Sequence, residues 1–201
     1  MKKLSLLASI VITLLISPLQ KSFAESIQPF STDGCSAYPD GIPGVDGRAW
    51  YHCCLAHDLA YWMGGPKIEK SIADDELNRC VSAESTSWHG KIMEMGVAIG
   101  GVPNTIFGWR WGYGFEESRS YQGLTKEEAE DALIKFDELI YHLQDIRDEL
   151  TQYQRGYVIG RFSYLRRLLQ DRAEQSLYSE DKAKRTEEEM RLQILIDLSM
   201  P

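Results

Sequence analysis

The chain has 201 residues, of which 43% are hydrophobic and 26% are charged, and its formal net charge is −8. A chain of this length can fold as one domain with a substantial core, with or without a smaller appendage. The excess of acids argues against a nucleic-acid binder, which usually shows a basic face, and against a general attraction to anionic lipid surfaces.

The first 24 residues have the pattern of a secretory signal peptide. Two lysines precede an apolar stretch that Pro18 ends, and the small residues Ser22 and Ala24 precede an expected cut after Ala24. An uncleaved signal anchor is the alternative interpretation. We expect cleavage and export, so that the mature chain is periplasmic or secreted. Because the segment holds three lysines and no acid, the net charge of the mature chain falls from −8 to −11.

Turn signals and hydrophobic periodicity divide the front half of the mature chain into one loop and three helices. Residues 25–49 contain three Asp-Gly pairs, with Pro39 and Pro43 between them, and are expected to be a loop. Helical patterns follow over 49–63, which Gly64-Gly65-Pro66 ends, over 68–82 and over 88–98. The expected apolar face of the second helix consists of Ile68, Ile72, Leu77 and Val81.

A run of aromatic residues follows the third helix. FGWRWGYGF at residues 107–115 alternates five aromatic side chains with Gly and Arg. A short strand, a hairpin and a folded loop all fit this run. We expect its side chains to pack locally in the core, and contact with an apolar substrate or a lipid is the alternative interpretation.

The back half of the chain reads as charged amphipathic helices without cysteine. Thr125-Lys126-Glu127-Glu128 is a capping box that begins a long helix. Gly156 and Gly160 are expected to interrupt or bend the next stretch, and helical patterns return over 162–177 and 186–198. The apolar face of the long helix is expected to hold Ala129, Ala132, Leu133, Phe136, Leu139, Ile140, Leu143, Ile146, Leu150 and Tyr153.

These patterns predict an all-α chain that divides near residue 122. A domain over 25–121 carries the cysteines and glycines, and 122–201 forms a helical extension or hairpin. We expect this extension to pack on the front half or on a protein partner. The charged residues of this extension are expected to lie on solvent-exposed faces of its helices.

Four cysteines lie in the exported part of the chain: Cys35, Cys53, Cys54 and Cys80. An even number in an exported chain suggests two disulfides. A bond between the adjacent Cys53 and Cys54 would be strained, so the two are expected to pair separately with Cys35 and Cys80. The alternative is a zinc site that includes nearby histidines, but the ligand spacing fits no zinc ribbon or finger.

The stretch CCLAHDLAY at residues 53–61 places reactive side chains on one expected helix. Cys53, His57 and Tyr61 are four residues apart and share one face of it. Asp58 lies about 100° round the helix from His57. The histidine and the tyrosine therefore point the same way, and the neighbouring carboxylate points elsewhere.

A carboxylate on the second helix is expected to reach this face. If the two helices are antiparallel and a disulfide at Cys80 joins them, Asp74 lies six residues, or roughly 9 Å, from that bond. The same distance along the first helix falls between His57 and Tyr61. Asp75, five residues from Cys80, is a possible substitute on spacing alone, so both acids stay candidates at this point.

This constellation suits hydrolysis. A histidine with one ring nitrogen held by a carboxylate has a fixed tautomer and can take a proton from water. Asp58, placed next to loop carbonyls, would form a site for a hard cation, best suited to Ca²⁺, which stabilises a developing oxyanion. The alternative interpretation is an ordinary packed His57 beside a surface acid.

The motif CC-x-x-HD-x-x-Y resembles the active-site helix of the secreted phospholipases A2, which reads CC-x-x-HD-x-C-Y. The segment DDELNRC at residues 74–80 is similar to the family's second helix, in which an aspartate lies six residues before a cysteine. That resemblance selects Asp74 over Asp75. Ala60 and Ala73 stand where the family has two cysteines that bond to each other. Both partners of that one disulfide are therefore absent from this chain.

The resemblance, which covers roughly residues 30–82, implies a role for each matching residue. His57 would be the general base, Asp74 would orient it, and Tyr61 would hydrogen-bond Asp74. The disulfides would be Cys53–Cys80 and Cys35–Cys54. The calcium ligands would be Asp58 and the backbone carbonyls of Gly34, Ser36 and Tyr38 in the stretch DGCSAYPDG, with Asp40 or Asp46 as a further ligand.

Three functions follow as hypotheses. The first is a calcium-dependent hydrolase that cleaves the sn-2 ester of a phospholipid at a membrane interface. The second is a catalytically silent scaffold of the same fold, with 122–201 binding a protein or membrane partner. The third is a metal-binding module that uses cysteine thiolates, which a count of free thiols would identify.

Overall fold

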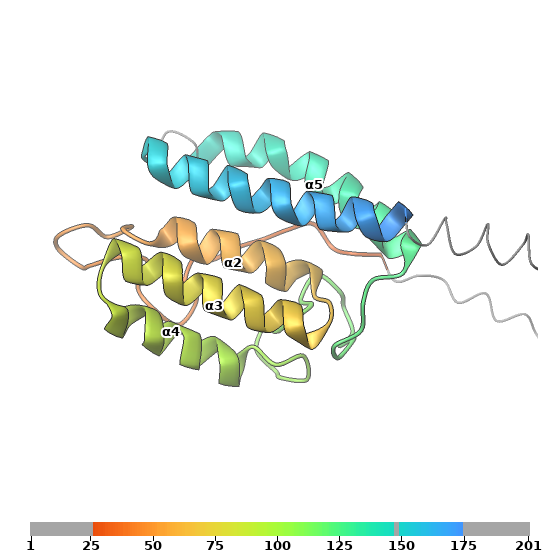
Figure 1. The fold of residues 1–201 in the computed structure, drawn as a ribbon, viewed down its shortest axis with the longest axis horizontal. Helices are drawn as coiled ribbons and strands as arrows, with labels where there is room; N and C mark the ends of the chain where they lie inside the picture. Colours follow the sequence, from red (N-terminus) through yellow and green to blue (C-terminus); the bar gives the residue numbers. More distant parts are fainter. Residues whose placement is uncertain (1–25, 147–148, 175–201) are drawn as a thin grey trace, which may run out of the picture.

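The computed structural model describes residues 26–146 and 149–174, and within these it is built from helices (Figure 1). The labelled helices are α2 (Tyr51–Met63), α3 (Lys67–Glu84), α4 (Ser87–Gly100) and α5 (Lys126–Ile146), and a further helix runs through 152–174. This part of the chain contains no strand, so the all-α prediction is confirmed. The predicted signal peptide (1–24) and the predicted helix 186–198 lie outside the described residues.

Helix α2 lies at the centre of the fold. In Figure 1, α3 and α4 lie on one side of it, and α5 with the helix 152–174 lies on the other. Every residue of α2 except Tyr51 is buried. The sequence explains this position, because its only polar members after Tyr51 are His52, His57 and Asp58, and a helix that is apolar on all sides must be covered on all sides.

The core extends across residue 122. Trp62 of α2 packs on Phe136 of α5 with ring centroids 5.6 Å apart, and Phe136 packs on Phe162 at 4.7 Å. The predicted capping box at the start of α5 is confirmed: Glu128 Oε2 accepts from the Thr125 N–H at 2.7 Å, and Thr125 Oγ1 accepts from the Glu128 N–H at 3.3 Å. The described part of the back half therefore packs on the front half.

The helix 152–174 corrects two expectations. Gly156 and Gly160 were expected to interrupt or bend it, but it continues through both. Each glycine costs a helix about 1 kcal/mol relative to alanine, and burial of the apolar side chains on the other face outweighs that cost. Tyr153, expected on the buried face, is 65% exposed. The buried apolar side chains of this helix are Val158, Phe162, Leu165, Leu169 and Ala173.

The buried face of α3 also differs from the expected one. Leu77 and Val81 are buried as predicted, but Ile68 is 66% exposed and Ile72 is 39% exposed. Two polar residues and an alanine occupy the buried positions in their place. The buried residues of α3 are Lys70, Ala73, Asp74, Leu77, Cys80 and Val81, which is one continuous helical stripe.

Both disulfides have the pairing that the resemblance implied. Cys35 bonds to Cys54 and ties the loop before α2 to that helix. Cys53, near the start of α2, bonds to Cys80, near the end of α3, so the two helices run antiparallel. No cysteine is free, which excludes a thiolate metal site in this oxidised form of the chain.

The aromatic run 107–115 is a folded loop that covers the end of α2. The N–H groups of Gly112 and Gly114 donate to the carbonyls of Tyr61 and Trp62, which lack partners inside the helix. A Cβ at Gly114 would lie 2.6 Å from Trp62, so only glycine allows this approach. Trp111 and Phe115 are buried in the core, as expected for local packing.

His52 predicts a pH dependence of stability. It is fully buried, and burial lowers its pKa from 6.5 to about 4. The unfolded chain therefore binds a proton here below about pH 6.5 that the folded chain binds only near pH 4. Stability from this difference, up to about 3 kcal/mol, is fully present above pH 6.5 and is lost as the pH falls toward 4.

Urea unfolding of the wild type and of His52→Leu between about pH 7 and pH 4.5 tests this contribution. The difference in free energy of unfolding between the two proteins should shrink as the pH falls. Parallel pH profiles for the two proteins would contradict the assigned pKa.

Candidate active site

A pocket of about 250 Å³ lies between the loop 34–38, α2 and α4. The loop residues predicted as calcium ligands, Gly34, Ser36 and Tyr38, line it together with His57 and Asp58. The Cys35–Cys54 bond holds the loop against α2 at this point. The remaining wall is largely apolar and includes Leu77, Ile92, Met93, Val97 and Trp109. Trp109 belongs to the aromatic run, so one member of that run borders the pocket.

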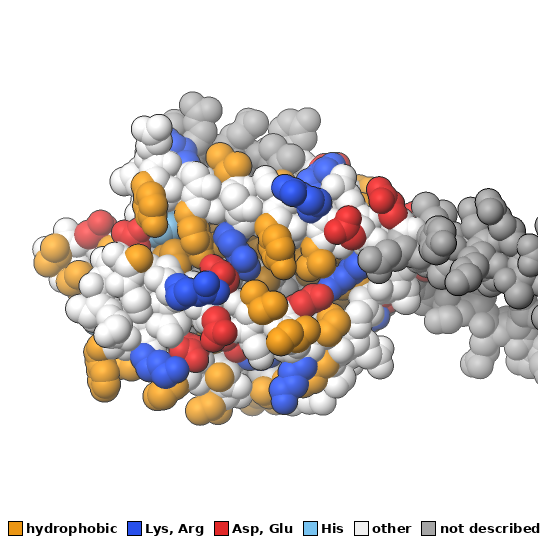
Figure 2. Space-filling model, in the orientation of Figure 1, with side chains coloured by type: hydrophobic (Ala, Val, Ile, Leu, Met, Phe, Trp, Pro, Cys, Tyr) orange, Lys and Arg blue, Asp and Glu red, His pale blue; other side chains and the backbone are white. Residues whose placement is uncertain are grey.

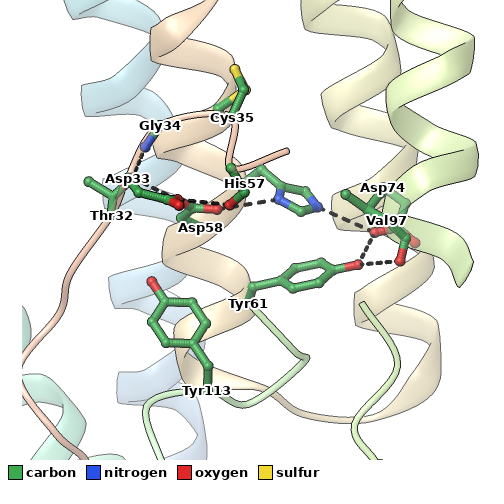
Figure 3. A network of polar contacts seen from close by, with 12 residues as sticks. Thr32, Asp33, Gly34, Cys35, His57, Asp58, Tyr61, Asp74, Val97 and Tyr113 are labelled. Carbon is green, nitrogen blue, oxygen red and sulfur yellow. Dashed lines mark hydrogen bonds and ion pairs between the residues drawn. A yellow bond between two sulfur atoms is a disulfide. The ribbon is translucent and has the colours of Figure 1, made fainter. Parts of the chain in front are cut away.

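His57 lies between two carboxylates, one at each ring nitrogen (Figure 3). Its Nε2 is 3.4 Å from Asp74 Oδ1, and its Nδ1 is 3.7 Å from Asp58 Oδ1. Burial disfavours the imidazolium, but hydrogen bonds and charge from Asp58 and Asp74 outweigh burial and raise the pKa of His57. With Asp74 accepting from the Nε2–H, the lone pair of Nδ1 faces Asp58 and the pocket.

Asp74 is the carboxylate that the second helix contributes, and it accepts from three donors. Tyr61 donates from its hydroxyl at 2.6 Å, Lys70 donates from Nζ at 2.7 Å, and His57 completes the set. Although burial opposes it, these donors together lower the pKa of Asp74, so the group is ionised. Asp75 is exposed, so the choice of Asp74 over its neighbour agrees with the structure.

Lys70 is a site residue that the sequence reasoning missed. It is 5% exposed, and its Nζ donates to Asp74 Oδ2 and, at 3.0 Å, to the carbonyl of Val97 on α4. The Tyr61 hydroxyl lies 3.3 Å from the same carbonyl (Figure 3). The available signal was the spacing, because a lysine four residues before an aspartate lies on the same face of a helix.

Asp58 lies where the pocket meets a second hollow, which Thr32, Asp33 and Tyr113 also line. Thr32 donates from Oγ1 to Asp58 Oδ2 at 2.6 Å. Burial raises the pKa of Asp58, partly offset by His57 and Thr32, and the charge of Asp33 adds to the rise. A bound cation would relieve this unfavourable burial of negative charge.

Hydrogen bonds brace the loop before α2 from within. Thr32 Oγ1 accepts from the Gly34 N–H at 3.0 Å, and Asp40 Oδ1 accepts from the Cys35 N–H at 2.8 Å. Asp46, the other acid considered as a ligand, accepts from the Arg48 N–H. Asp40 and Asp46 therefore stabilise backbone turns of this loop, and neither residue lines the pocket. The structure thus brings together all the other predicted site residues.

No known protein-family model, curated protein or solved structure matches this chain. The roles of the site residues therefore rest on their geometry and on the short motifs that they occupy.

Proposed function

We propose that the chain is a calcium-dependent hydrolase of the phospholipase A2 type that cleaves the sn-2 ester of glycerophospholipids. The observation that carries the proposal is the position of His57, with Nε2 held by Asp74 and Nδ1 facing a pocket that Asp58 borders. A histidine oriented in this way is a general base, and the pocket gives the ester a place beside it.

In the proposed reaction, Nδ1 of His57 takes a proton from water as the water oxygen attacks the ester carbonyl. Asp74 keeps the proton of the ring on Nε2, and Tyr61 and Lys70 keep Asp74 in place. His57 then returns its proton to the departing alkoxide. The products are a fatty acid and a lysophospholipid.

The donor set near His57 fits calcium. Asp58 and the carbonyl-bearing residues Gly34, Ser36 and Tyr38 line one pocket and offer oxygen ligands, which Ca²⁺ prefers. Asp58 is a buried carboxylate that a cation would stabilise. Asp58 and the three carbonyls would hold the ion, which would supply positive charge for a developing oxyanion.

The apolar surroundings of the pocket favour a lipid substrate at a membrane interface. In Figure 2, hydrophobic side chains gather along the lower edge of the molecule, where α4 lies in Figure 1. Helix α4 also lines the pocket through Ile92, Met93 and Val97. No described helix is long and apolar enough to cross a membrane. The large exposed apolar side chains of α4 and the segment after it are Trp88, Met95, Ile99, Ile106 and Phe107.

The test measures fatty-acid release from phospholipid vesicles labelled at the sn-2 position. We expect release with calcium, none with a chelator, and a large loss in Asp58→Asn. The control is Asp75→Asn, which removes an exposed carboxylate and should leave release unchanged. Equal release with calcium and with chelator would contradict the calcium-dependent mechanism. No release from several lipids, with both disulfides formed, would contradict the enzyme.

A catalytically silent scaffold is the second candidate, and one observation favours it. Both oxygens of Asp58 have protein neighbours, because Thr32 donates to one and His57 faces the other. In such a scaffold, 122–201 would bind a protein or membrane partner, and Ile134, Ile159 and Tyr164 are exposed on its described part. A calcium titration separates the candidates, because no binding at millimolar calcium would favour the scaffold.

A further inference from the structure

A second group of ligand-type side chains lies at the disulfide between α2 and α3, outside the pocket of His57. His52 is fully buried there, and its Nε2 lies 3.5 Å from Cys53 Sγ and 3.6 Å from Cys80 Sγ. Glu84 Oε1 lies 3.5 Å from the same nitrogen. The ligand atoms of His52 and the two cysteines all lie within 4.8 Å of one another. We propose that this cluster binds Zn²⁺ once the Cys53–Cys80 bond has been reduced.

The distances around the imidazole nitrogen are those of a zinc tetrahedron. With Zn–N of about 2.0–2.1 Å and Zn–S of about 2.3 Å, tetrahedral coordination places nitrogen and sulfur about 3.6 Å apart. A carboxylate oxygen bound to the same ion would lie about 3.4 Å from the nitrogen. The observed distances from His52 Nε2 to both sulfurs and to Glu84 Oε1 match these edges. The two sulfurs, now bonded to each other, would have to separate to about 3.8 Å.

His52 is prepared to act as a ligand. Its Nδ1 is buried without a hydrogen-bond partner in the described part of the chain, whereas Nε2 faces Glu84 and both sulfurs, so Nε2 is the nitrogen placed to bind an ion. Tyr157 packs edge-on against the ring, which helps to fix its orientation. Two thiolates and an imidazole are ligands that suit zinc, and Glu84, whose Oε1 is near the imidazole nitrogen, is the nearest carboxylate for a fourth position.

The redox step is a thiol–disulfide exchange. A dithiol reductant supplies two electrons and two protons to the Cys53–Cys80 bond and leaves as its own disulfide. Zn²⁺ then displaces the two thiol protons, since the thiolates are the ligands. When the Cys53–Cys80 disulfide is reduced, the ion would take over its role of linking α2 to α3. These two helices carry His57 and Asp74. This site does not depend on the proposed hydrolysis.

The experiment titrates Co²⁺, a spectroscopic probe for zinc, and then Zn²⁺ into the full chain after reduction with a phosphine that is removed before the metal is added. We expect one equivalent of Co²⁺ to give thiolate charge-transfer bands and the visible bands of a tetrahedral site, and Zn²⁺ to displace it. The oxidised chain should give neither. The variant Cys35→Ser/Cys54→Ser, which leaves only the Cys53–Cys80 pair, should bind as the reduced wild type does.

The decisive variant is His52→Leu, with His89→Gln as a matched histidine control. Loss of His52 should weaken Zn²⁺ binding to the reduced chain more than about tenfold, and loss of His89 should leave it unchanged. Circular dichroism follows folding in the same samples. Equal affinity of His52→Leu and the wild type would overturn the proposal, as would a reduced chain that binds no Co²⁺, whether it is folded or unfolded.

Discussion

Replacing His57 with glutamine is expected to lower the rate of sn-2 ester hydrolysis by about 10²–10⁴-fold, which is the usual contribution of a general acid–base group. Glutamine approximates the size of the imidazole and can still donate to Asp74, so the pocket is expected to keep its shape. It cannot take a proton from water. Fatty-acid release at saturating substrate measures the loss directly.

The matched control for this substitution is His89→Gln, because His89 lies outside the pocket and packs on Trp50. It should retain the wild-type rate. Calcium binding by the His57→Gln protein should also persist, since the ligands proposed for the ion are unchanged. If the glutamine variant hydrolyses lipid as fast as the wild type, His57 is not the base, and the proposed mechanism is wrong.

Replacing Lys70 with methionine is expected to lower the free energy of unfolding by about 3 kcal/mol, because removal of one partner of a buried ion pair leaves the other charge uncompensated. Lys70 Nζ lies 2.7 Å from Asp74 Oδ2, and both residues are buried. The double variant Lys70→Met/Asp74→Asn removes both charges and should recover most of that stability. It should not recover hydrolysis, since Asp74 no longer fixes His57.

Urea unfolding of the two single variants and the double variant measures this coupling. Lys91→Met is the surface control, because Lys91 pairs with Glu94 at 2.8 Å but its side chain is 58% exposed. That change should cost less than about 1 kcal/mol. Equal losses for Lys70→Met and Lys91→Met, or additive losses in the double variant, would show that the buried pair does not couple as inferred.

Much of the site could be predicted because its residues lie in short, fixed patterns. The helical spacing placed His57 and Tyr61 on one face, and two disulfides were expected from the cysteine count. The distance from Cys80 limited the second carboxylate to Asp74 or Asp75. Resemblance to a known motif was needed to choose between these two, and to pair the cysteines, because spacing alone left both questions open.

The missed features depend on tertiary contacts that no local pattern encodes. Lys70 and Asp74 carry charges, so α3 was assigned an apolar face through Ile68 and Ile72. The structure instead turns the charged pair inward, where each residue satisfies the other, and leaves both isoleucines exposed. Thr32 was missed because nothing in a turn-rich loop indicates which hydroxyl will reach Asp58.

The central position of α2 has a consequence for the order in which the molecule can assemble. The helix that carries His57 and Asp58 buries Leu59 and Trp62 in a cluster with side chains that occur much later in the chain, from Ala129 in α5 to Ala173 in the helix 152–174. In a chain that emerges from its N-terminus, α2 appears long before α5 and the helix 152–174, which cover it. Until that cover arrives, α2 has a large apolar surface facing water, and contacts so distant in sequence form slowly. We therefore expect the pocket to form late in folding, after a segment that contributes none of its lining residues has covered α2.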